Sequence, residues 1–166
     1  FRTKNSGSKF KNGDTLFARI TPCLENGKTA FVNFLPSDDD VACGSTEFIV
    51  LRSKTVIPEF VYLLARSDEF RDIAIKSMSG ATGRQRVREA CFDQFYFGHP
   101  TPTLLEQFQE VANPLFRSVF TLAKKNHNLR TTRDLLLPKL ISGKLDVEDL
   151  DIDLGMTAEA LEEATA

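Results

Sequence analysis

The sequence predicts an α+β protein in which a small mixed domain is followed by one long helix. β-prone segments bounded by turn residues fill the first third of the chain, two helical patterns begin near residue 58, and residues 103–143 carry an unbroken heptad pattern. With 166 residues, 42% of them apolar, the chain can bury one sizeable core. We expect a domain over residues 1–100, a helix over 103–143 and a disordered acidic tail over 144–166.

Three strands are expected, over residues 15–20, 29–34 and 47–51. After the turn at Gly13-Asp14, the first strand places alternate side chains on opposite faces. Asn26-Gly27 is the favoured pair for a type I′ turn, so the first two strands should form a hairpin.

Two short helices should follow the strands. Pro58 suits the first turn of a helix because its fixed φ and missing N–H fit there. The helical spacing changes near Ser67-Asp68, where the two helices should meet. The aromatic-rich segment 91–97 is expected to return to the core as a strand.

The long helix has predicted signals at both ends. Thr103 and Glu106 match a capping box, in which each side chain bonds the backbone amide of the other. Gly143 suits the left-handed residue that follows a helix. Pro114 should cause a kink, or a restart capped by Asn113, because a proline inside a helix loses a backbone bond.

Alternating steps of three and four residues from Phe108 form a seam that is typical of coiled coils. Buried polar seam residues cost stability but can fix register and partner. Pairing through this seam is the interpretation we favour, and one amphipathic helix packed on its own domain is the alternative. The seam residues expected to pair are Leu115, Val119, Leu122, Asn126, Leu129, Arg133 and Leu136.

Charge is unevenly distributed along the chain. Residues 145–166 hold eight acids and no base, which leaves 21 basic against 15 acidic residues in the rest, a net charge of +6. A basic body suits a polyanionic partner, and an ordinary basic surface is the alternative.

The three cysteines are far apart and indicate reduced thiols of a cytoplasmic protein. No apolar run is long enough to cross a membrane.

Catalytic, cofactor and metal motifs are not expected. The Gly27-Lys28-Thr29 sequence lacks the earlier glycine and the following helix of a phosphate-binding loop. The run 38–40 of three aspartates is expected to be a solvated turn, because three adjacent acids cannot all face one ion.

The segment 79–88 is the strongest candidate for binding. Arg84, Gln85 and Arg86 can make bidentate contacts to base edges, arginine to guanine and glutamine to adenine, while Thr82 and the glycines let backbone amides approach phosphate. Two alternatives remain for this segment: it is an ordinary solvated basic loop, or Arg84 and Arg86 only pair with a nearby acid, Asp68, Glu69 or Glu89.

Several segments, in this order, are similar to the DNA-specificity subunit of type I restriction-modification enzymes. They are 9–22, 26–28, 45–48, 79–86, 106–107 and a long helix that ends within 136–143. The resemblance runs from about residue 9 to 145. It covers one recognition domain and one long helix, so the chain resembles the C-terminal half of such a subunit or a half-size version.

The resemblance implies sequence-specific binding of double-stranded DNA without catalysis by this chain. It implies that the domain reads one half of a split target, that the helix spaces the half-sites, and that methyltransferase (modification) and restriction subunits are partners. Arg19 and Lys28, near strand ends, are expected to face DNA with the 79–88 segment, and the helix can pair with a second copy as a homodimer. Two alternatives remain: the recognition part of a fused restriction-methylation enzyme, and a coiled-coil scaffold that does not bind DNA.

Overall fold

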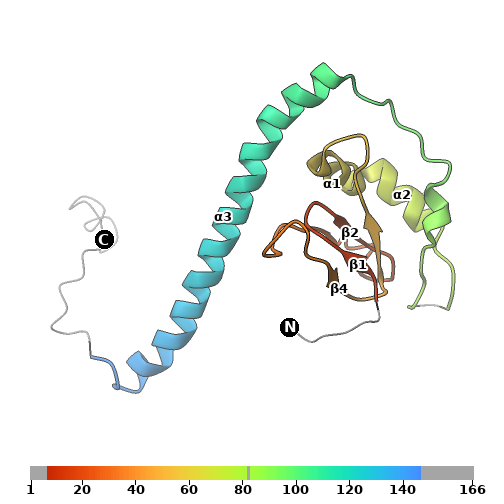
Figure 1. Cartoon of the computed structure of the whole chain (residues 1–166). Coiled ribbons are helices and arrows are strands. Elements are labelled where there is room, and N and C mark those ends of the chain that lie inside the picture. The colour runs from red at the N-terminus through yellow and green to blue at the C-terminus, as the bar shows by residue number, and fades with distance from the viewer. Residues whose placement is uncertain (1–6, 82, 147–166) are drawn as a thin grey trace, which may run out of the picture. The chain divides into compact units, whose positions relative to one another are not determined.

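The computed structural model describes residues 7–81 and 83–146 (Figure 1). The chain divides into two compact units, Phe1–Phe120 and Thr121–Ala166. The predicted α+β class is confirmed, with small antiparallel sheets, short helices and one long helix. The elements are β1 Lys9–Phe10, β2 Thr15–Ala18, β3 Thr29–Phe31, β4 Ala42–Cys43, β5 Phe48–Leu51, α1 Pro58–Arg66, α2 Asp68–Lys76, the 3-10 helix η1 Glu89–Phe92 and α3 Pro102–Ile141.

The main sheet has the order β3-β2-β5 and is antiparallel throughout. Phe17 of β2 lies opposite Ile49 of β5, and both are buried. Phe17 also makes edge-to-face ring contacts with Phe70 of α2 and Phe92 of η1. This face of the sheet therefore forms the main core against α2 and η1.

The opposite face of the sheet supports a second, smaller core. Phe10, Val32 and Leu35 are buried there, and Leu16 of β2 packs against them. The β1-β4 pair lies in the same cluster through Phe10 and Ala42. Because both faces of β2 are covered, neighbouring residues of this strand are apolar instead of alternating with polar ones.

The turn before β2 is held by a buried carboxylate. Asp14 is 1% exposed and accepts hydrogen bonds from the Lys11 amide at 2.8 Å and from Arg52 at 2.7 and 2.6 Å. Gly13 has a φ of 83°, which confirms the expected turn at Gly13-Asp14.

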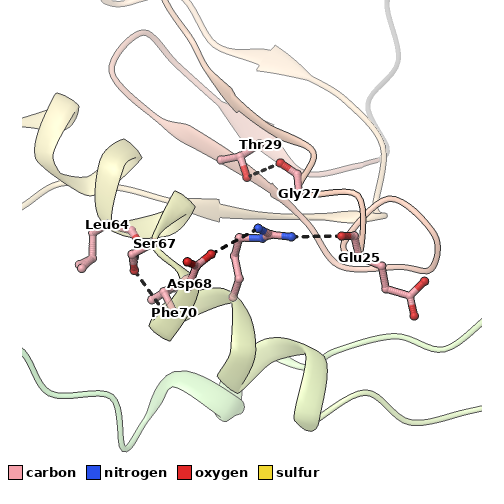
Figure 2. Close-up of polar contacts among 8 residues, drawn as sticks. Glu25, Gly27, Thr29, Leu64, Ser67, Asp68 and Phe70 are labelled. Carbon is pink, nitrogen blue, oxygen red and sulfur yellow. Dashed lines mark hydrogen bonds and ion pairs between the residues drawn. The ribbon is translucent and has the colours of Figure 1, made fainter.

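The two short helices meet where the sequence predicts. Pro58 occupies the first turn of α1. Ser67 ends α1 and caps α2: its hydroxyl donates to the Leu64 carbonyl at 2.8 Å and accepts from the Phe70 amide at 3.4 Å (Figure 2). One extended residue therefore separates the two helices.

The hairpin of β2 and β3 is confirmed, but the type I′ turn is wrong. Asn26 does not have positive φ, which that turn requires, and Gly27 alone does, at 65°. Residues 22–28 instead form a helical turn that closes with two bonds, from the Gly27 amide to the Leu24 carbonyl and from the Lys28 amide to the Cys23 carbonyl. This is the pattern of a glycine-terminated helix end, in which the left-handed residue allows both bonds.

The strand expected over residues 91–97 is also wrong. Residues 89–92 form η1, and no strand follows within 93–97. Two aromatic side chains of this segment pack on α2, where the ring of Phe92 stacks on Phe70 at 4.0 Å and that of Phe95 meets it edge-on at 5.1 Å. Aromatic packing, not strand pairing, determines its place.

The N-terminal cap of α3 is Thr101, not the capping box of Thr103 and Glu106. The Thr101 hydroxyl accepts from the Leu104 amide at 3.3 Å, and Pro102 is the first helical residue. A proline at this position needs no hydrogen-bond partner for its nitrogen, so the helix starts earlier than the capping box predicts.

The C-terminal end of α3 confirms the prediction for Gly143. This glycine has a φ of 65°, and its amide bonds the Leu140 carbonyl while the Lys144 amide bonds the Lys139 carbonyl. These two bonds define a Schellman motif. Between its ends, α3 is one helix of 40 residues that does not restart at Asn113.

Candidate nucleic-acid interface

The loop of residues 79–86 is a closed hairpin. Ser79 and Arg86 exchange two backbone hydrogen bonds at its base, at 2.9 and 3.0 Å, and the Arg84 amide bonds the Ala81 carbonyl at its tip. Gly80 and Gly83 have φ values of 120° and 79°, which favour glycine. The base of the loop is therefore closed, and Arg84 is exposed near the tip.

The base of the loop is fixed to the end of β2. The Thr21 amide bonds the Gln85 carbonyl, and the Val87 amide bonds the Arg19 carbonyl. The Arg19 side chain donates to the Val87 carbonyl at 3.1 Å, and Val87 is completely buried. Residues 85–87 thus pair with 19–21 through an isolated antiparallel bridge.

An ion pair joins the loop to the start of β5. Arg86 donates two hydrogen bonds to the Glu47 carboxylate, at 2.8 and 2.6 Å. The bonds from Arg86 hold the pKa of Glu47 below its usual range, and the positive charge of Arg19 acts in the same direction. Both side chains remain partly exposed, 48% for Arg86 and 35% for Glu47.

Lys28 follows the turn between β2 and β3, and α2 supports that turn. Arg71 of α2 donates to the Glu25 carbonyl at 3.1 Å, and Figure 2 shows Glu25 and Gly27 on the turn across from Ser67 and Asp68. A Cβ added at Gly27 would lie 3.1 Å from the Arg71 guanidinium. The glycine thus lets the arginine lie close beneath the turn, and Lys28 is exposed.

A shallow hollow of about 450 Å³ lies on the sheet beside these residues. Its apolar lining includes Leu16, Ala18 and Phe48, and Lys28 and Glu47 also line it. An apolar floor beside charged groups can contact thymine methyl groups and phosphates together.

The structure thus brings together some of the predicted residues. Arg19, Lys28 and Arg86 lie around Glu47, which sequence reasoning did not select, although it falls in the 45–48 segment that supports the resemblance. Arg86 pairs with Glu47, not with Asp68, Glu69 or Glu89. The Arg84 side chain is exposed and makes no hydrogen bond or ion pair with any residue that the structure describes, and Gln85 is half-buried. Thr82 lies outside the described residues.

The helix α3 carries a second candidate interface. Within the first unit, Phe108 contacts Phe60, Ala112 is 4% exposed, and Phe116 packs edge-on against Phe31 and Tyr62. A four-residue spacing advances by 40° per step at 100° per residue, so these positions share one side of the helix.

The seam residues from Leu115 onwards are exposed. At about 100° per residue, Leu115 and Val119 lie on the same side of the helix as Phe108 and Ala112, so the seam continues the apolar side that begins with the domain contact. Phe108 and Ala112 therefore belong to the domain contact, in place of the partner seam that we predicted from Phe108. The exposed seam positions are Leu115, Val119, Leu122, Asn126, Leu129, Arg133 and Leu136.

No cluster of possible metal ligands and no candidate membrane span is found in the part of the chain that the structure describes. No three His, Cys, Asp or Glu side chains there could hold an ion together. The run 38–40 is an exposed turn in which Asp40 accepts from the Ser37 amide and Asp38 accepts from Asn12. None of the described helices has the length and apolar character of a membrane span.

Fold and site together define a small α+β domain with an anchored basic loop, followed by a long helix. No protein-family model matches the chain. It is similar to the specificity subunit of the type I restriction enzyme EcoAI from Escherichia coli, at 35% identity over 109 residues, and to that of EcoEI from the same organism, at 29% over 102 residues. The predicted resemblance to type I specificity subunits is confirmed.

The matches cover only part of each protein. They include 63% and 60% of this chain but 17% of each relative's length. A solved chain from a study of complex assembly and conformational transition of the type I R-M system matches with a TM-score of 0.45 and 27% identity, covering 89% of this chain and 37% of that one.

Proposed function

We propose that this chain recognises double-stranded DNA in a sequence-specific way, as part of the specificity subunit of a type I restriction-modification complex. The observation that supports this most is the closed 79–86 loop, which holds Arg84 at an exposed tip while its base is bonded into the sheet. A side chain reads base edges well only when its frame is rigid.

Within this proposal, the side chains have different tasks. Arg84 and Gln85 contact base edges or phosphates, and Lys28 and Arg19 face the backbone of the duplex. Thr82 belongs to the same loop, and its proposed role is to contact a phosphate of the duplex. Arginine and glutamine have the paired donors and acceptors that bidentate contacts with guanine and adenine need.

The proposal also covers the organisation of the chain. Residues 1–100 read one half of a split target, and the helix of residues 103–143 sets the spacing to the other half. The exposed apolar seam of α3 supports pairing with another helix, from the same subunit or from a second copy. Methylation and cleavage would come from modification and restriction subunits, since the relatives are subunits of restriction enzymes.

The substitution Arg84→Ala tests the DNA contact. We expect weaker binding to a duplex, measured by fluorescence anisotropy of the full chain at several salt concentrations. If Arg84 contacts phosphate, affinity should fall evenly across sequences, and the slope of log K against log salt should flatten by about 0.9. If it reads a base, the loss should be about 1–3 kcal/mol on the preferred sequence, with relaxed preference at one position.

Arg66→Ala is the matched control, because it removes the same charge from the end of α1. It should leave the affinity and the salt slope nearly unchanged. Unchanged binding by Arg84→Ala to every duplex would contradict the site, and absence of duplex binding by the unaltered chain would contradict the function.

A further inference from the structure

Glu47 and Arg86 are both held at the same strand end. The Arg19 amide bonds the Glu47 carbonyl at 3.1 Å, and the Val87 amide bonds the Arg19 carbonyl at 2.9 Å. Ile20 forms an isolated bridge with Arg86. The backbones of the acid and the base are therefore both fixed to 19–20, and their side chains bond each other there.

The ion pair between Glu47 and Arg86 contributes little to the stability of the fold, but it fixes the orientation of the Arg86 side chain. Both side chains are partly exposed, and an exposed ion pair adds little to the free energy of unfolding. Its geometry is bidentate, which fixes the plane of the guanidinium. Of the five N–H donors of arginine, two are used by Glu47, which leaves three for another acceptor.

Glu47 is also an anion inside a cationic cluster. Arg19 and Arg86 act on its carboxylate, and it lines the same hollow as Lys28. An acid at this place repels phosphate and competes with it for Arg86, so it lowers affinity for any duplex regardless of sequence. A carboxylate that weakens general attraction while fixing an arginine improves discrimination between sequences.

We propose that Glu47 is a specificity-determining residue, which holds Arg86 in one orientation for a base-edge contact and keeps it from binding phosphate non-specifically. The inference rests on the proposed DNA-binding function and extends it to a residue of opposite charge. Arg86 is then a reader whose position depends on Glu47, while Arg84 at the loop tip is not paired with it.

The test compares Glu47→Gln with the unaltered full chain. Binding is measured on a pool of random-sequence duplexes at several salt concentrations, and sequence preference is measured by enrichment from that pool. Glu47→Gln should bind the pool about 3–10 times more tightly at low salt. The salt slope should steepen by about 0.9, the value of one additional phosphate contact, and enrichment for any preferred sequence should fall.

Two further variants separate the proposed role from a general charge effect. The double variant Glu47→Gln with Arg86→Gln should not bind the random-sequence pool more tightly than the unaltered chain. The arginine that Glu47→Gln frees to bind phosphate is absent from it. Glu110→Gln removes the same charge from an exposed site on α3 and should change neither the slope nor the enrichment. Thermal unfolding of each variant, followed by circular dichroism, shows whether the fold is kept.

The outcomes distinguish the inference from the function on which it rests. No duplex binding by the unaltered chain contradicts the function itself. Duplex binding with the same slope and enrichment in Glu47→Gln overturns the inference alone, and so does a gain that persists in the double variant. A fall in pool binding by folded Glu47→Gln also overturns it, since the acid would then support general affinity.

Discussion

Gly83 shows how a single backbone angle shapes the candidate interface. Its φ is 79°, and a Cβ at this position would meet no atom within 4 Å. Space is therefore available for a side chain, and only the backbone conformation opposes one. Gly83→Ala should lower the free energy of unfolding by about 1–2 kcal/mol, the cost of placing an L-residue in the left-handed region.

Urea titration measures this effect, and Gly98→Ala is the matched control. Gly98 also has open space around it but no positive φ, so its substitution should change stability little. Gly83→Asn should fall between the two, because asparagine tolerates the left-handed region. Equal losses in Gly83→Ala and Gly98→Ala would show that the backbone angle is not the cause.

At the scale of elements, α3 continues through Pro114 without a restart. The proline has no N–H to donate to the carbonyl four residues earlier, and its ring crowds that carbonyl. Pro114→Ala should therefore stabilise the helix by about 1–3 kcal/mol. We expect more helix by far-ultraviolet circular dichroism and a higher unfolding temperature.

Ser118→Ala is the control for helix propensity alone, since Ser118 is an exposed position of the same helix. It should give a gain of no more than about 0.5 kcal/mol. If Pro114→Ala lowered stability, a bend at the proline would be needed for Ala112 and Phe116 to pack on the domain.

Local signals predicted the elements well, and distant contacts account for the errors. Pro58, Ser67 and Gly143 act within a few residues, so their effects could be read from the sequence. The turn at 26–27 could not, because Arg71 supports it from 46 positions further along the chain. The segment 91–97 has a strand-like composition but is placed by aromatic contacts with α2.

The same distinction holds for the candidate interface. The loop residues Arg84, Gln85 and Arg86 could be selected from type and spacing alone. The pairing of Arg86 with Glu47 joins positions 39 apart, and only the sheet brings them together. Sequence reasoning therefore found the cations but missed the acid that restrains one of them.

For the whole molecule, the apolar pattern of α3 has two parts, one that packs within the first unit and one that is exposed. Phe108 and Phe116 pack on α1 and Ala112 is buried, whereas the seam from Leu115 to Leu136 remains exposed, with Leu122 and Leu129 62% and 70% exposed. A row of exposed leucines at heptad spacing is unfavourable in water unless another helix covers it. We predict that the full chain associates through this row.

Substituting Leu122→Asn and Leu129→Asn together should abolish the association. Each buried leucine contributes about 1.5–3 kcal/mol, so removing two from each chain of a dimer should weaken it by roughly 10⁴-fold or more. Sedimentation velocity over a range of concentrations measures this, with Leu135→Asn as the control. Leu135 is 62% exposed on the opposite side of the helix, so its loss should leave association unchanged. A chain that stays monomeric at high concentration would exclude homodimerisation and leave pairing with a different helix as the role of the seam.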